Sequence, residues 1–131
     1  LAAVNATRED LALIDAAQQQ VAEAIHDEGF GVAEDFAFHR QIAIATKNPH
    51  FPRILDFLGQ HMIPRTKVQF SEEARLAYEN LILNQHQQIF RCLVRGDEVE
   101  ARNAVRQHLD GARRRYAEAS EDPGRQEEER R

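Results

Sequence analysis

The chain has 131 residues, of which 42% are hydrophobic and 30% are charged, and its formal net charge is −5. These values are typical of one globular domain with one core. The sequence has no apolar run of membrane-spanning length and no signal-peptide pattern, so we expect no membrane partner. It also has no stripe of basic residues that could bind phosphate groups, so we do not expect this chain to bind nucleic acid directly. Trp is absent and aromatic residues make up 7% of the chain, which favours an aliphatic helical core over an aromatic-rich β-sandwich.

The first half of the chain predicts three amphipathic helices, at residues 8–28, 32–47 and 49–65. Thr7 and Asp10 form a capping box before the first of them. Asn48 is expected to cap the third helix, with Pro49 in its first position. The helical spacing of apolar residues predicts the inner faces. These are Leu11, Ile14, Val21 and Ile25 on the first helix, Asp35, Phe36, His39, Ile42, Ala43 and Thr46 on the second, and Ile54, Leu55, Leu58 and Met62 on the third.

The second half predicts two more helices. One opens at Ser71 and carries Leu76, Leu83, Ile89, Phe90 and Leu93 on its face, and the pattern leaves open whether it breaks in the middle. Gly96 ends it, and Asp97 caps the next helix, residues 98–117, whose expected inner face is Val105, His108, Leu109 and Ala112. The charged stretch 118–131 is typical of a disordered tail. The fold class is therefore all-α, an antiparallel bundle of about five to six helices over residues 1–117.

Four polar residues on these inner faces form the candidate site. Asp35 and His39 are four residues apart, so both side chains lie on one face of their helix, one turn apart. His86 and His108 lie within the patterns of two further helices. A single histidine on an apolar face is more often a hydrogen-bonded core residue than a ligand. One carboxylate and three imidazoles that converge would instead suit a borderline-hard divalent metal.

Two further residues have competing interpretations. Arg65, at the end of the third helix, is either a solvated cation near a helix C-terminus or a residue whose guanidinium binds a ligand carboxylate through two N–H groups. Cys92 is the only cysteine, so it cannot form an internal disulfide, and it is most simply a small core residue. A lone thiol fits a reducing, cytoplasmic location.

Several motifs together resemble the FCD domain, the effector-binding domain of FadR-subfamily, GntR-type bacterial transcription regulators. They are Asp35-Phe-Ala-Phe-His-Arg-Gln-Ile, Ala45-Thr-Lys-Asn-Pro, Asn84-Gln-His-Gln-Gln-Ile-Phe, Arg95-Gly-Asp, Ala101, Ala104 and His108-Leu109. The resemblance implies a helical bundle with a metal site at Asp35, His39, His86 and His108. It also implies a small organic acid bound beside the metal, a homodimer, and DNA contact through an N-terminal winged helix-turn-helix domain that this sequence does not contain.

The sequence departs from the family pattern at two places. Gln85 stands where family members commonly have Glu before the third histidine, which changes the charge next to the ligands. The family's first helix is nearly absent, and Leu1-Ala2-Ala3 corresponds to its last turn. That helix often contributes an Arg to the effector pocket, so the pocket is expected to be incomplete here.

The resulting hypothesis is a sensor domain that is not an enzyme. It would hold a divalent ion, with zinc first and nickel or manganese as alternatives, and an acid whose remaining charge Arg65 neutralises. Two other classes remain open. A metal with open positions could activate water in an enzyme acting on small carboxylates, although no general base or nucleophile motif accompanies it. The histidines could also be structural in a metal-free helical interaction module.

Overall fold

The computed structural model describes residues 1–26, 31–62 and 72–120. Within these ranges the chain forms helices and no strand, which confirms the all-α prediction. The helices are α1 (Ala2–Asn5), α2 (Arg8–His26), α3 (Val32–Ala45), α4 (His50–Met62), α5 (Glu72–Arg95) and α6 (Glu98–Ser120). None of the described helices is long and apolar enough to cross a membrane.

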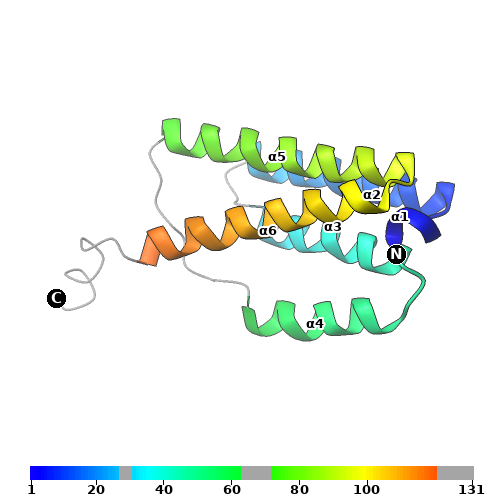
Figure 1. Cartoon of the computed structure of the whole chain (residues 1–131). Helices are drawn as coiled ribbons and strands as arrows, with labels where there is room; N and C mark the ends of the chain where they lie inside the picture. The colour runs from blue at the N-terminus through cyan, green and yellow to red at the C-terminus, as the bar shows by residue number, and fades with distance from the viewer. Residues whose placement is uncertain (27–30, 63–71, 121–131) are drawn as a thin grey trace.

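The helices from α2 to α6 alternate in direction along the chain (Figure 1), so the bundle is antiparallel as predicted. Helix α2 packs on both α3 and α5, and α5 packs on α6. Helix α4 packs against α3 alone among the described helices. In the described ranges the backbone of α3 does not come close to that of α5 or α6, so side chains fill the space between them.

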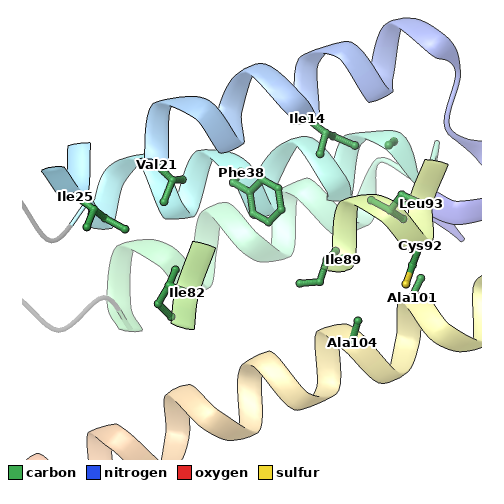
Figure 2. Packing of buried hydrophobic residues seen from close by; sticks show 12 residues of the cluster. Ile14, Val21, Ile25, Phe38, Ile82, Ile89, Cys92, Leu93, Ala101 and Ala104 are labelled. Carbon is green, nitrogen blue, oxygen red and sulfur yellow. The ribbon is translucent and has the colours of Figure 1, made fainter. Parts of the chain in front are cut away.

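The hydrophobic core lies between α2, α3, α5 and α6 (Figure 2). Helix α2 contributes Ile14, Val21 and Ile25, which are four or seven residues apart and therefore share one face. Phe38 of α3 is fully buried at the centre of the cluster. Helix α6 contributes only Ala101 and Ala104 as apolar core residues, and their small side chains allow its backbone to approach α5 closely. The other core members are Ala2, Ala45, Ile82, Ile89, Cys92 and Leu93, which confirms Cys92 as a core residue.

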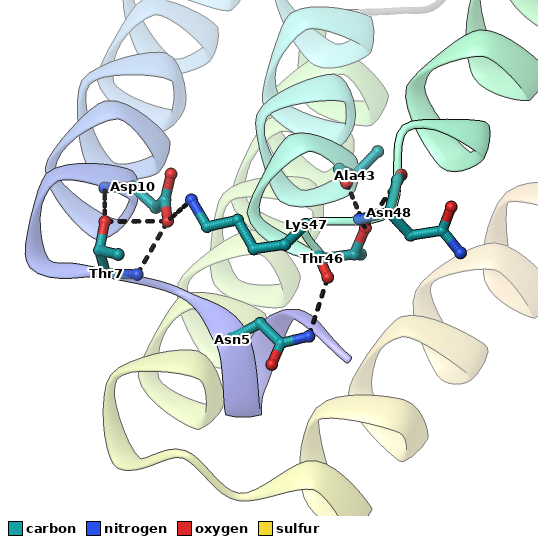
Figure 3. Close-up of polar contacts among 7 residues, drawn as sticks. All are labelled: Asn5, Thr7, Asp10, Ala43, Thr46, Lys47 and Asn48. Atoms are coloured by element: carbon teal, nitrogen blue, oxygen red, sulfur yellow. Dashed lines mark hydrogen bonds and ion pairs between the residues drawn. The ribbon is translucent and has the colours of Figure 1, made fainter.

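The predicted helix boundaries agree with the hydrogen bonds at the helix ends. The Thr7 hydroxyl accepts from the Asp10 amide at 3.1 Å while Asp10 Oδ2 accepts from the Thr7 amide at 2.8 Å, which is the reciprocal capping box (Figure 3). Asn48 Oδ1 accepts from the His50 amide at the start of α4, and Asp97 Oδ1 accepts from the Glu100 amide at the start of α6. These local signals locate the ends because each cap satisfies backbone donors that the helix leaves unpaired.

Helix α3 ends in a turn that joins three elements at one end of the bundle. Lys47 adopts a left-handed conformation with φ of 60° and forms an ion pair with Asp10 of α2 at 2.5 Å. The Asn5 side-chain amide donates to the Thr46 carbonyl at 2.8 Å, which ties α1 to the same turn (Figure 3). The C-terminus of α3 is therefore fixed to both α1 and α2.

Some predicted inner faces were wrong in detail. Phe38 occupies the core instead of Phe36, whose ring packs on Gly59 of α4 at a point where a side chain on residue 59 would clash. Leu109 is 55% exposed and Ala112 is also exposed, because the buried stripe of α6 is Ala101, Ala104 and His108. On α4, the predicted face includes Ile54 and Leu58, which are exposed.

Helices α5 and α6 differ slightly from the prediction in length. Helix α5 is continuous from Glu72 to Arg95, so the possible break in its middle does not occur. Helix α6 extends to Ser120, beyond the predicted end at Ala117. The rest of the predicted tail, residues 121–131, lies outside the described residues, as do the end of the third predicted helix and Pro64.

Candidate metal centre

The four candidate ligands come together in the middle of the bundle. Asp35 and His39 come from α3, His86 from α5 and His108 from α6, and each offers one ligand atom within 4.8 Å of the others. His108 Nε2 lies 3.2 Å from His39 Nε2 and 3.3 Å from His86 Nε2. Asp35 Oδ1 lies 3.0 Å from His86 Nε2 and 3.6 Å from His39 Nε2. These four side chains therefore link α3 to α5 and α6, whose backbones do not come close to that of α3 in the described ranges.

Each residue reaches this position for a local reason. Asp35 lies in the first turn of α3, where the helix dipole favours a carboxylate, and His39 follows one turn later on the same face. His86 belongs to the buried stripe of α5, four residues after Ile82 and three before Ile89. His108 lies four residues after Ala104 on the corresponding stripe of α6. The apolar periodicity that builds the core thus also brings two imidazoles into it.

The protonation states suit metal ligation at neutral pH. Burial lowers the pKa of His39, and it outweighs the opposing effect of the Asp35 carboxylate, so the pKa lies below the ordinary 6.5. Burial alone would raise the pKa of Asp35, but its contact with His86 and the nearby imidazoles keep it below the ordinary 3.8. Near pH 7 the carboxyl is therefore ionised and His39 is neutral, which are the forms that bind a metal.

Two further side chains hold the histidine rings. The Phe38 ring stacks on the His86 ring, with centroids 4.2 Å apart and planes at 20°. Gln85 Oε1 lies 2.8 Å from His108 Nδ1, the ring nitrogen on the far side from the cluster. The sequence singled out Gln85 only as a change in charge, and Phe38 was missed because the pattern favoured Phe36. The position of Phe38 next to His39 in an aromatic motif was the signal that could have identified it.

The residues present fit a divalent metal ion. With bonds of about 2.0–2.1 Å, two ligand atoms lie about 3.3 Å apart around a tetrahedral ion and about 2.9 Å apart at neighbouring octahedral positions. The four nearest separations, 3.0 to 3.6 Å, fall around these values. Asp35 Oδ1 is buried and has no hydrogen bond of good geometry, so its lone pairs are available to an ion. The donor set of three nitrogens and one oxygen is also one that zinc accepts.

The site is less buried on one side. The His86 side chain is fully buried, whereas the Asp35 and His39 side chains are 41% and 20% exposed. The α3 side of the cluster is therefore its less buried side, although the Asp35 Oδ1 atom itself is buried. The neighbouring Arg40 binds Asp56 of α4 through two hydrogen bonds, at 2.8 and 3.1 Å, so its guanidinium is already paired. Arg65, the predicted effector ligand, lies outside the described residues.

The comparison with protein families agrees with this geometry. The sequence model of the FCD domain matches residues 1–111, which is most of the chain. The chain belongs to the FCD domain family. This confirms the resemblance that the motifs indicated, and FCD domains are regulatory domains of GntR-family transcription factors. The comparison with curated proteins gives no match.

Proposed function

We propose that this FCD domain is the effector-sensing part of a GntR-type transcription regulator, and that it binds a divalent metal and a small organic acid. The observation that carries the proposal is the convergence of Asp35, His39, His86 and His108 within an FCD fold. Three of the four side chains come from residues that are far apart in sequence. A bundle stabilised only by apolar packing would have no need to bring them together, because buried polar groups without good partners are costly.

Zinc is the first choice for the metal, with nickel and manganese as alternatives. Imidazole nitrogen suits zinc and nickel, while the carboxylate also allows manganese. When bound, the ion would supply Lewis acidity and an open coordination position. The chain's own residues would hold the ion and so tie their helices to it: Asp35 and His39 from α3, His86 from α5 and His108 from α6.

The charge of this site favours an anionic ligand. A dication beside one aspartate and neutral imidazoles carries a net positive charge, which would attract a carboxylate. Such an acid would reach the centre from the side of Asp35 and His39, whose side chains are partly exposed. In this proposal Arg65 neutralises the remaining negative charge of the acid, and its guanidinium suits a carboxylate because two N–H groups can donate in parallel.

Regulation would follow from the linkage of three helices. An acid at the centre changes the packing of α3 against α5 and α6 if it binds two arrangements of the bundle with unequal affinity. In this proposal the DNA contact belongs to an attached winged helix-turn-helix domain of the regulator. We further propose a cytoplasmic homodimer. Exposed apolar side chains on α4 favour association of that kind, and they are Phe51, Ile54, Phe57 and Leu58.

The metal proposal is tested by elemental mass spectrometry of protein purified without chelator. The parent is expected to contain close to one equivalent of metal, and His86→Ala is expected to lose it. His50→Ala is the matched control, because His50 is exposed at the start of α4 and is not a member of the cluster. Absence of metal from the parent, even after zinc or nickel is added, would make the four residues structural and favour the metal-free interaction module.

The acid proposal is tested with the metal-loaded parent. A panel of small mono- and dicarboxylic acids is screened by thermal shift, and a binding acid should lose its effect in Asp35→Ala. The same acids are incubated with the protein and analysed for products by mass spectrometry. Turnover that depends on the metal would replace the sensor by the enzyme alternative.

A further inference from the structure

Gln85 contacts the outer ring nitrogen of a ligand histidine. Its Oε1 atom lies 2.8 Å from His108 Nδ1, and the two residues belong to α5 and α6. An amide oxygen only accepts hydrogen bonds, so Nδ1 must be the donor in this contact. A neutral imidazole carries one N–H. The other nitrogen of His108, Nε2, therefore retains its lone pair.

That lone pair points to the centre of the cluster. His108 Nε2 is the atom that lies 3.2 Å from His39 Nε2 and 3.3 Å from His86 Nε2. In the opposite tautomer this nitrogen would carry a proton and could not bind an ion. The tautomer of His108 thus decides whether the centre has a complete set of ligands.

His86, the other buried histidine of the cluster, is held in a different way. His86 Nδ1 is buried and has no hydrogen-bond partner among the described residues, and the stacked Phe38 ring fixes the plane of the imidazole instead. Ring stacking sets an orientation but selects neither tautomer. The hydrogen bond from His108 to Gln85, by contrast, can select one.

We propose that Gln85 is a positioning residue of the centre, which selects the tautomer of His108 that leaves Nε2 free to ligate. The inference rests on the proposed function for its metal, but the tautomer itself is a property of the metal-free chain. Because Gln85 is neutral, it fixes His108 without adding a negative charge beside the ion. A carboxylate at this position would hold the same tautomer and make the imidazole more basic.

The first test reads the tautomer without any metal. The full chain is labelled with ¹⁵N-histidine, and long-range ¹H–¹⁵N spectra are recorded at pH 7.5 in the presence of a chelator. The parent is expected to show His108 protonated at Nδ1. Gln85→Leu should populate the Nε2-protonated form, and Gln85→Glu should retain the parent tautomer. A parent His108 protonated at Nε2 would overturn the proposal.

The second test measures zinc affinity by competition with a chromogenic chelator. Gln85→Leu should bind zinc about 10- to 100-fold more weakly, which is the usual effect of losing such a partner. Gln85→Glu should bind at least as tightly as the parent. Gln88→Leu is the matched control, since Gln88 is exposed on the same helix, and it should leave the affinity unchanged. Circular dichroism verifies that each variant is folded.

The outcomes separate this inference from the proposed function. Equal zinc affinity in the parent and Gln85→Leu would overturn the role of Gln85 and leave the metal site intact. A parent that binds no zinc would overturn the metal site, while the spectra would still decide whether Gln85 selects the tautomer. If Gln85→Leu does not fold, the comparison of Gln85→Glu with the parent still tests the proposal, because a shift of the proton to Nε2 would contradict it.

Discussion

Zinc binding should raise the thermal stability of this domain strongly, because the proposed ligands join α3 to α5 and α6, which α3 otherwise meets through side chains alone. The unfolded chain has no comparable site, since His39, His86 and His108 come together only in the folded state. Free zinc at about 1,000 times its Kd would add about 4 kcal/mol to the free energy of unfolding. For a chain of 131 residues the entropy of unfolding is about 0.27 kcal/mol/K, so Tm should rise by about 15 °C.

The assay is differential scanning calorimetry of chelator-treated protein with and without zinc. His108→Ala should lose nearly all of the increase, and His50→Ala should retain it because His50 is not a member of the cluster. An equal increase in the parent and in His108→Ala would refute the reasoning, since the ion would then bind elsewhere on the chain. No increase in the parent up to millimolar zinc would refute the metal site itself.

Three further predictions concern the fold. Phe38→Ala should lower the free energy of unfolding by about 3–5 kcal/mol in urea titrations, because the ring is fully buried; Val99→Ala, at a residue that is 68% exposed, should cost about 1 kcal/mol or less. Lys47→Gly should be more stable than Lys47→Ala by about 1 kcal/mol, since both lose the ion pair but only glycine relieves the left-handed backbone; equal urea midpoints would contradict this strain. The pKa of Asp10 is lowered chiefly by its bond to Lys47 and also by the amide of Thr7. As the pH falls, the Asp10 carboxyl of the unfolded chain therefore takes up a proton before that of the folded chain. The contribution of Asp10 to stability is complete above the ordinary pKa of 3.8 and disappears below the lowered pKa of the folded chain. The urea midpoint should thus fall less between pH 6 and 3 in Asp10→Asn than in the parent.

The sequence by itself determined the helices and the capped starts of α2, α4 and α6. Apolar spacing is a property of one helix, and the Thr7–Asp10 box, Asn48 and Asp97 each act within a few residues, so neighbours in sequence contain the whole signal. The pairing of Asp35 with His39 was predictable for the same reason, because one turn of helix separates them. The remaining two candidates, His86 and His108, were predicted from their places in two further helical patterns, and the family motifs then supported all four residues.

Only the tertiary structure decided which of several apolar faces became the core. Helix α3 has Phe36 on one side and Phe38 on the other, and the sequence pattern favoured Phe36. Phe36 packs on Gly59 of α4, while Phe38 stacks on His86 of α5. Likewise, Leu109 has the apolar character of a core residue, but the buried stripe of α6 runs through Ala104 and His108 instead.

The contacts around the candidate metal centre were also decided only by the tertiary structure. The distance between His86 and His108 depends on how α5 and α6 pack, and the bond from His108 to Gln85 depends on the rotation of both helices about their axes. Amphipathic periodicity indicates which sides of a helix can be buried, but it contains no information on which neighbour covers such a side or at what register. That choice minimises the free energy of the whole bundle, in which the volumes and hydrogen bonds of all packed helices are satisfied together.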